Sequence, residues 1–102
     1  TPEGKWLWPG FGDNSRVLKW MCDRVEGKVG AKKTAIGLLP QAADLDLNGA
    51  KIPNENVTEL LRVDEAAWKA EVPEIDQYFA LFGTRLPPRV KQQLRGLAER
   101  LG

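Results

Sequence analysis

The stretch KWLWPGFGDNSRVLKW, residues 5–20, contains three of the four tryptophans of the chain and a Gly-Phe-Gly turn. Large aromatic side chains usually lie in a core, whereas glycines allow the backbone to turn. Asp13, Asn14 and Ser15 follow the turn, and each carries an oxygen that can cap the N-terminus of a helix. We therefore expect a loop over residues 1–13 that leads into a helix and either folds under a core or binds a flat ligand.

The predicted helix covers residues 14–27 and has one apolar face. Its apolar residues recur at spacings of one, three, one and three, and they are Val17, Leu18, Met21, Cys22 and Val25. Gly27 can adopt the left-handed conformation that ends a helix. Because an apolar face favours burial, we expect Cys22 to be a small buried hydrophobe. Trp20 and Trp68 are expected to be packing residues.

The remainder of the chain divides into a region of loops and short strands, residues 28–53, and a helical region, residues 54–102. In the first region we expect a basic loop over residues 28–33 and a short strand over residues 36–39, which Pro40 ends. Leu45 and Leu47 alternate with polar residues in the manner of a strand. In the second region we expect a short helix over residues 54–61, with three side chains facing inward: Val57, Leu60 and Leu61.

Two longer helices are predicted to form an antiparallel hairpin. The first begins at Asp64, ends at Gly83 and contains Pro73, which should kink it. Its apolar stripe consists of Trp68, Val72, Ile75, Phe79 and Phe82. The second begins near Pro87 and Pro88, and its stripe consists of Val90, Leu94, Leu97 and Leu101. Spacings of three and four residues place each stripe on one helix face, so we expect the two stripes to be mutually buried.

The composition limits the kind of protein. With 15 basic and 14 acidic residues the net charge is +1, so no overall field attracts nucleic acid or an anionic membrane. No apolar run approaches the roughly 20 residues that span a bilayer. Histidine, the commonest general base and metal ligand, is absent. The single cysteine, Cys22, fits a reducing compartment. Because the chain opens on Thr1 with no turn or cap of its own, we interpret it as part of a longer protein.

The aromatic loop admits two interpretations. In the first, the rings of Trp6 and Phe11 face each other across a slot for a planar base, and stacking contributes roughly 1–3 kcal/mol per base. The amide of Asn14 could then select the base, since guanine presents N1–H and N2–H donors beside O6, whereas adenine lacks O6 and the N2 amine. In the second, Trp6, Trp8 and Phe11 are core aromatics and Asn14 is only an N-cap. Spacing alone leaves both open.

Other candidate sites have simpler explanations. The run PGFGDN, residues 9–14, is a poor phosphate loop, because it lacks the Gly-Lys-Ser/Thr ending and because Asp13 places a negative charge where the anion would bind. Asp44, Asp46 and Asp64 are better explained as turn and cap residues than as a metal cluster. A set of basic residues marks the solvated side of the last helix: Arg85, Arg89, Lys91, Arg95 and Arg100. No nucleophile–base pair is evident.

Three motifs together resemble one family. They are WPGFGDNSRVLKW at residues 8–20, DRVEG at residues 23–27 and TAIGLLP at residues 34–40. In this combination they resemble the C-terminal region of GTP-dependent phosphoenolpyruvate carboxykinase, and the resemblance covers essentially the whole chain. It implies an α/β parent enzyme with the carboxykinase fold, of which residues 1–102 would form the C-terminal part of the nucleotide-binding domain and would be mainly helical.

The resemblance also implies a reaction and a base site. The parent would be a cytoplasmic lyase of gluconeogenesis that converts oxaloacetate and GTP into phosphoenolpyruvate, GDP and carbon dioxide. Phe11 matches a family aromatic that stacks on guanine, and Trp6 matches a second one that is usually phenylalanine. Asn14 matches the asparagine at the guanine edge. Gly12 and Asp13 complete the nucleotide-contacting turn, with Asp13 in place of the usual glutamate.

The catalytic groups of the family are implied to lie outside this segment. These are the phosphate loop with its reactive cysteine, the manganese ligands and the oxaloacetate-binding arginines; magnesium would accompany the nucleotide. We therefore predict no catalytic residue and no metal ligand here, and no activity for the isolated segment. Its partners would be the remainder of the carboxykinase chain and a guanine nucleotide, in a monomeric parent. The alternative is a non-catalytic helical protein-interaction module in which the aromatic loop is core.

Overall fold

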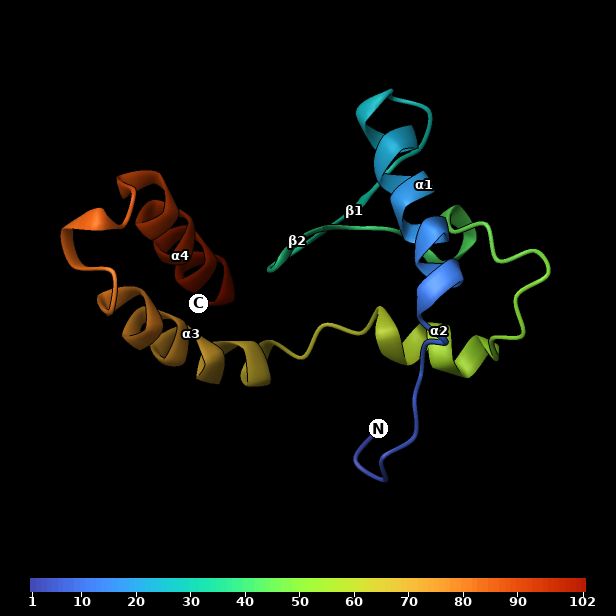
Figure 1. Ribbon diagram of the computed structural model, residues 1–102, viewed down its shortest axis with the longest axis horizontal. Helices are drawn as coiled ribbons and strands as arrows, with labels where there is room; N and C mark the ends of the chain where they lie inside the picture. Colours follow the sequence, from blue (N-terminus) through green and yellow to red (C-terminus); the bar gives the residue numbers. More distant parts are fainter. The chain divides into compact units, whose positions relative to one another are not determined.

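The computed structural model describes all 102 residues. In chain order its helices and strands are α1 Asn14–Val25, β1 Lys32–Thr34, β2 Gly37–Leu39, α2 Asn54–Leu60, α3 Glu65–Ala80 and α4 Pro88–Leu101 (Figure 1). The prediction of a mainly helical segment with a short strand region and a helical hairpin is confirmed. The chain forms two compact units. Unit 1 comprises Thr1–Lys33 with Leu38–Arg62, and unit 2 comprises Thr34–Gly37 with Val63–Gly102.

Helix α1 begins at the predicted residue, but none of the predicted caps acts as one. No side chain caps its first turn. Instead the Asp13 carboxylate binds Arg16, and the Ser15 hydroxyl donates to the Gly12 carbonyl at 2.7 Å. The oxygen of Asn14 also has another partner, the indole of Trp8. The helix ends at Val25, and Gly27 takes the predicted left-handed conformation two residues later, with a φ of +72°.

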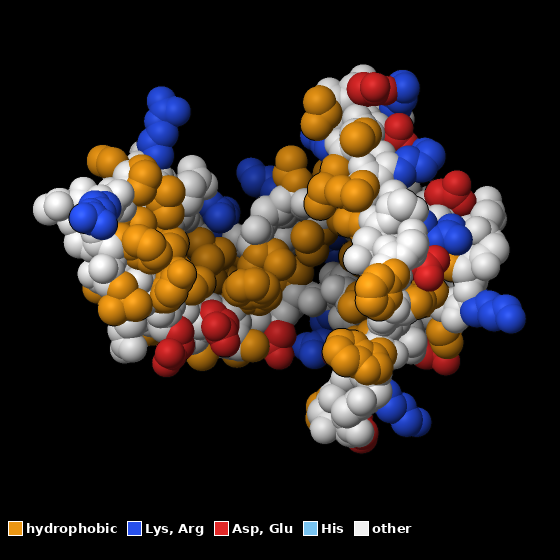
Figure 2. Space-filling model, in the orientation of Figure 1, with side chains coloured by type: hydrophobic (Ala, Val, Ile, Leu, Met, Phe, Trp, Pro, Cys, Tyr) orange, Lys and Arg blue, Asp and Glu red, His pale blue; other side chains and the backbone are white.

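The prediction that the apolar face of α1 is buried is wrong. Leu18, Met21 and Val25 are 60%, 50% and 89% exposed, and Cys22 is exposed as well. Trp20, on another side of the helix, is buried. Periodicity identifies a face that favours burial, but the other elements of unit 1 determine which face is covered. In Figure 2 the apolar side chains along α1 accordingly lie at the surface.

The core of unit 1 is small and is supplemented by polar contacts. Its buried apolar residues are Trp20, Leu45 and Val57. Helix α2 agrees with the predicted helix to within one residue, yet Leu60, predicted to face inward, is 41% exposed. The side chain of Asn56 donates from Nδ2 to the Leu7 carbonyl at 3.2 Å. This bond ties the N-terminal loop to α2.

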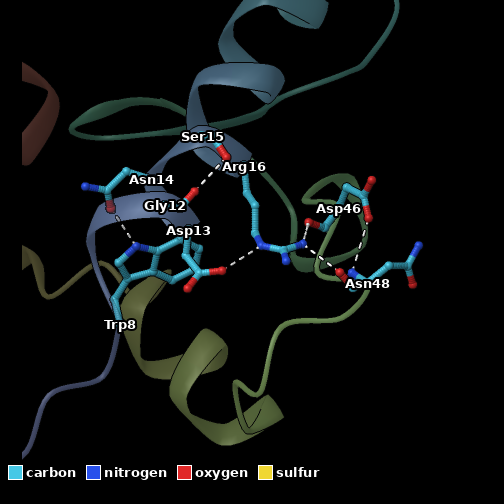
Figure 3. Close-up of polar contacts among 8 residues, drawn as sticks. All are labelled: Trp8, Gly12, Asp13, Asn14, Ser15, Arg16, Asp46 and Asn48. Carbon is cyan, nitrogen blue, oxygen red and sulfur yellow. Dashed lines mark hydrogen bonds and ion pairs between the residues drawn. The ribbon is translucent and has the colours of Figure 1, made fainter.

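Arg16 joins two loops that are about 30 residues apart in sequence (Figure 3). Its Nε donates to Asp13 Oδ1 at 2.9 Å. Its Nη1 donates to the carbonyls of Asp46 at 2.7 Å and Asn48 at 2.9 Å. A planar guanidinium can satisfy several acceptors at once. The side chain therefore fixes the turn before α1 against the loop after Leu45.

The predicted strand at residues 36–39 is present as β2, but its partner was not anticipated. Strand β1 lies at the end of the segment predicted to be a basic loop, residues 28–33. The Thr34 hydroxyl donates to the Gly37 carbonyl at 2.7 Å across the tight turn. A two-residue connection of this kind allows only antiparallel pairing. The alternation around Leu45 does not form a strand.

In unit 2, α4 folds back on α3 as a helical hairpin (Figure 1). Asp64 caps α3 as predicted, because its Oδ1 accepts from the Ala67 N–H at 3.0 Å. Pro88 occupies the first turn of α4, where a missing N–H costs nothing. Helix α3 continues through Pro73 and ends at Ala80, short of the predicted Gly83, which lies in a following turn.

Burial in the hairpin is less complete than predicted. On α4, Leu94 and Leu101 are buried, and Val90 is 37% exposed. The α3 stripe is half-buried at Val72, Ile75 and Phe79, but Trp68 is 36% and Phe82 is 44% exposed. Two helices alone cannot cover a stripe on all sides, so a broad apolar area over α3 and α4 remains open (Figure 2). Full mutual burial of the two stripes is therefore wrong.

Truncating a buried residue of the hairpin should destabilise unit 2. We expect Leu94→Ala to lower the free energy of unfolding by about 2–4 kcal/mol, because it leaves a cavity between the helices. Leu81→Ala is the matched control, since Leu81 is 80% exposed, and it should change stability by under about 0.5 kcal/mol. Denaturant unfolding of both variants measures the difference. Equal effects would contradict the packing described for α4.

Replacing Arg16 with lysine should loosen unit 1. Lysine keeps the charge but lacks the planar fork, so it cannot keep all three contacts. We expect Arg16→Lys to lower the free energy of unfolding by about 1–2 kcal/mol. Arg24→Lys is the control on the same helix, because Arg24 makes one long contact of 3.5 Å to the Val29 carbonyl. If the two variants unfold alike, the contacts of Arg16 do not stabilise the unit.

Candidate functional site

The backbone turns sharply between Pro9 and Asp13. Gly10 has a φ of +81°, and the Asp13 N–H donates to the Gly10 carbonyl at 3.1 Å across a short 3-10 turn at Phe11–Asp13. Phe11 has a φ of +44° and is the one non-glycine residue with a positive φ. That conformation costs a residue with a side chain about 1 kcal/mol or more. Strain of this kind concentrates at functional loops, so the turn is a candidate ligand-binding element.

Two aromatic rings of this loop extend into solvent. Trp6 is 91% and Phe11 is 97% exposed. They line a pocket of about 790 Å³ together with Trp8 and Asn14. Neither ring packs against another aromatic side chain; the ring pairs of the chain involve Tyr78 and its neighbours. Because both rings are exposed, the interpretation of Trp6 and Phe11 as core aromatics of this segment is wrong. Leaving large apolar rings in water is unfavourable.

Trp8 and Asn14 form a hydrogen-bonded pair at the wall of this pocket. The Trp8 indole Nε1 donates to Asn14 Oδ1 at 2.8 Å (Figure 3). Trp8 is half-buried, and Asn14 is exposed at the first position of α1. The Asn14 amide nitrogen points away from the indole and has no hydrogen-bond partner within the chain. Asn14 therefore presents two N–H donors outward, and it does not cap the helix.

The other two residues of the predicted nucleotide turn lie beside this pair. The Asp13 carboxylate is held by Arg16, as described above. Gly12 is exposed, and a Cβ placed on it would meet no atom within 4 Å. Neither its backbone conformation nor a neighbouring atom of this segment therefore requires glycine at position 12. The structure places Trp6, Phe11, Gly12, Asp13 and Asn14 on one continuous loop and helix start.

A second pocket shares Trp8 and Asn14 with the pocket of the exposed rings. It has a volume of about 630 Å³, and both residues contribute to its wall. Its remaining lining is aliphatic: Val17, Leu18, Pro40, Leu45, Val57, Leu60 and Leu61. It has no exposed aromatic ring and few polar groups, so it suits packing against apolar side chains better than binding a base. The pocket with the exposed rings is the better candidate for a planar ligand.

The segment carries few groups for acid–base or metal chemistry. No three Cys, Asp or Glu side chains are grouped so that they could bind a metal ion. Cys22, predicted to be buried, is exposed on α1. The pKa of Lys19 is raised because Asp23, one turn further along α1, accepts its hydrogen bond at 2.6 Å. None of the helices is both long and apolar enough to span a bilayer.

Sequence reasoning missed the roles of Trp8 and Arg16. For Trp8 the spacing suggests only the core position of the second interpretation, although an indole N–H near a loop asparagine is a possible donor to it. The motifs assign no role to Arg16, although a basic residue in the first turn of a helix opposes the helix dipole and so indicates a specific contact. Both partners of Arg16 beyond Asp13 are backbone carbonyls. Every residue has a backbone carbonyl, so the types of the partner residues cannot predict these contacts.

Comparison with known proteins gives the family. Residues 1–100 match the profile of the phosphoenolpyruvate carboxykinase C-terminal P-loop domain. The chain is 46% identical over 102 residues to the proteins named phosphoenolpyruvate carboxykinase [GTP] of Renibacterium salmoninarum and Paenarthrobacter aurescens. These alignments cover 100% of this chain and 17% of each relative. The relative of the same name from Neocallimastix frontalis is 48% identical over 99 residues, which are 96% of this chain and 16% of that protein.

The chain thus spans about a sixth of the length of the relatives that it matches. The motif at residues 8–20, which carries Phe11 and Asn14, lies within the matched region, and so does Trp6 just before it. A match over nearly the whole chain at this level of identity is far more specific than a lone Gly-X-Gly. On these grounds the chain belongs to the GTP-dependent phosphoenolpyruvate carboxykinase family, within the C-terminal P-loop domain.

Proposed function

We propose that this segment binds the guanine base in a GTP-dependent carboxykinase that converts oxaloacetate and GTP into phosphoenolpyruvate, GDP and carbon dioxide. The observation that carries the proposal is the pair of exposed rings, Trp6 and Phe11, beside the free amide donors of Asn14. In this proposal, residues 1–102 are the C-terminal part of the nucleotide-binding domain. Such a segment recognises the base of the nucleotide and takes no part in the chemical step.

Stacking would supply most of the base affinity. Phe11 is held outward by a strained turn, so its ring is available to a ligand without rearrangement of the loop. Trp6 offers a second ring in the same pocket. Stacking of a base on an aromatic ring contributes roughly 1–3 kcal/mol. This contribution is similar for guanine and adenine, so the rings bind a base without selecting it.

Selection would come from Asn14 and the turn beside it. An amide at the edge of the base can form hydrogen bonds with guanine that adenine cannot reproduce. A mismatched polar contact in a buried site costs about 1–3 kcal/mol. Gly12 leaves open space next to the pocket, and Asp13 completes the turn while its carboxylate binds Arg16. These residues would let the nucleotide approach the backbone closely.

The chemical step would depend on other parts of the enzyme. The resemblance implies manganese and a magnesium-bound nucleotide, but the side chains of this segment form no metal-binding group. We therefore assign no step to a metal here, and we expect the isolated segment to be inactive. The place of the parent enzyme in gluconeogenesis, its monomeric state and its cytoplasmic location are parts of the same proposal. The free thiol of Cys22 is compatible with a reducing compartment.

The exposed apolar face of α1 would pack against the remainder of the carboxykinase chain. This α1 face, formed by Leu18, Met21, Cys22 and Val25, is uncovered in the segment. Relatives of the segment are about six times longer, so ample chain exists to cover the face. Burying apolar surface contributes roughly 25 cal/mol per Å². The aliphatic pocket beside Leu18 continues the same surface.

Base recognition can be tested in a full-length chimaera, in which these 102 residues replace the matching segment of the Paenarthrobacter aurescens relative. Phe11→Ala should weaken GTP and GDP binding by roughly 1–3 kcal/mol, about 10- to 100-fold, without creating a preference for ATP. Asn14→Ala should instead lower the ratio of GTP affinity to ATP affinity, because an edge contact is lost. Calorimetric titration with each nucleotide measures both effects.

Two substitutions at residues that do not line the ring pocket serve as controls for this experiment. Tyr78→Ala removes an exposed ring of unit 2, and Asn54→Ala removes an exposed amide at the start of α2. Neither should alter nucleotide affinity. Unchanged GTP binding by Phe11→Ala would exclude the stacking role. An unchanged GTP-to-ATP ratio in Asn14→Ala would exclude the guanine-edge role of Asn14.

The packing of the α1 face can be tested through Cys22. In the full-length chimaera we expect its thiol to be protected from alkylation, because the remainder of the chain covers it. In the isolated segment the thiol is exposed and should react at once. Mass spectrometry of the peptide that contains Cys22 distinguishes it from other cysteines, and the unfolded chimaera gives the unprotected rate. Alkylation of the folded chimaera at that rate would show that the face is not covered.

A further inference from the structure

We propose that Trp8 is a positioning residue for base selection: its indole N–H fixes the Asn14 amide so that the NH₂ group faces the base and reads the purine O6. The inference rests on the proposed function, because it concerns the same base site. It begins from the 2.8 Å bond between Trp8 Nε1 and Asn14 Oδ1 (Figure 3). Among the tryptophans, Trp8 alone has a hydrogen-bonded indole N–H, whereas that of Trp20 is buried without a partner.

The chemistry of the two groups determines the orientation of the amide. An indole nitrogen donates one hydrogen bond and accepts none. An asparagine amide has one end that accepts and one end that donates. If the Asn14 amide were rotated by 180°, its NH₂ group would meet the indole N–H, donor against donor. The bond to Trp8 therefore holds the carbonyl inward and the NH₂ group outward.

Both members of the pair are held by the fold before any ligand binds. Trp8 follows Leu7, whose carbonyl accepts the Asn56 side chain from α2 at 3.2 Å. Asn14 follows Asp13, which Arg16 fixes at 2.9 Å. Trp8 is half-buried, and it contributes to the walls of both pockets. The amide is therefore oriented by the protein and not by the base, which lowers the ordering cost of binding.

The outward NH₂ group specifies which atom of the base is read. Guanine carries an acceptor, O6, where adenine carries the N6 amine, a donor. The NH₂ group of Asn14 can donate a hydrogen bond to O6 of guanine. Facing the N6 amine of adenine, it meets another donor, so the Asn14 NH₂ group and the N6 amine are both left unpaired. With the opposite orientation, Asn14 would read the N1–H and N2 amine of guanine through its oxygen. The indole N–H thus selects between two possible modes of guanine recognition.

The first test removes the indole donor and keeps an aromatic ring. In the full-length chimaera, Trp8→Phe should lower the GTP-to-ATP affinity ratio by roughly 10- to 100-fold, the range expected for one unmade hydrogen bond. Asn14→Ala should lower it similarly, and the double variant should lower it no further, because the residues act as a unit. Trp68→Phe, an indole loss in unit 2, should leave the ratio unchanged.

A purely structural role of Trp8 would give a different result. It would lower thermal stability and weaken GTP and ATP binding alike, with effects that add to those of Asn14→Ala. If Trp8→Phe does not fold, β-(3-benzothienyl)alanine at position 8 keeps the bicyclic ring and replaces the indole N–H with sulfur, which cannot donate. An unchanged GTP-to-ATP ratio in the folded variant, or additive effects in the double variant, would overturn the inference.

The second test uses inosine triphosphate, which keeps O6 and N1–H but lacks the N2 amine. If the Asn14 NH₂ group reads O6, Asn14→Ala should weaken GTP and inosine triphosphate binding equally, and their ratio should stay constant. A falling ratio would mean that Asn14 reads the N2 amine, and the orientation set by Trp8 would then be wrong. If Asn14→Ala leaves the GTP-to-ATP ratio unchanged, the guanine-edge role in the proposed function fails, and the inference fails with it. If only Trp8→Phe leaves that ratio unchanged, the inference alone fails.

Discussion

The contacts of Arg16 are the constraint on which the loop that carries Phe11 and Asn14 depends. One guanidinium binds the Asp13 carboxylate and the backbone carbonyls of Asp46 and Asn48. Asp13 closes the strained turn that holds Phe11 outward, and Asn14 follows it directly. Few side chains of unit 1 are buried, so this polar contact replaces part of what a larger core would supply. The loop is held by hydrogen bonds where apolar packing is scarce.

Such a site is suited to a segment that works inside a larger enzyme. The rings that would bind the base are left exposed, as a preformed pocket for a planar ligand requires. The apolar residues of α1 are exposed as well, although nothing in the proposed function needs them in water. These two kinds of exposed surface have different explanations, since one fits a nucleotide and the other fits the remainder of a chain about six times longer.

Local sequence signals predicted the elements well and their burial poorly. The cap at Asp64, the proline at the start of α4 and the glycine after α1 all act within a few residues. The apolar residues of α1 do share one helix face, yet that face is exposed at Leu18 and Met21, and Trp20 is buried instead. Which face of a helix is covered depends on elements distant in sequence. The exposure of Cys22 has the same cause.

The sequence by itself determined the family, the order of the helices and the loop that carries Trp6, Phe11 and Asn14, because each rests on residue type and short spacing. Only the tertiary structure decided that the rings of Trp6 and Phe11 are exposed, that Arg16 binds two distant carbonyls and that Trp8 orients the Asn14 amide. Residue type specifies that an amide can both donate and accept. The direction in which it does so is set by the neighbour that folding brings to it.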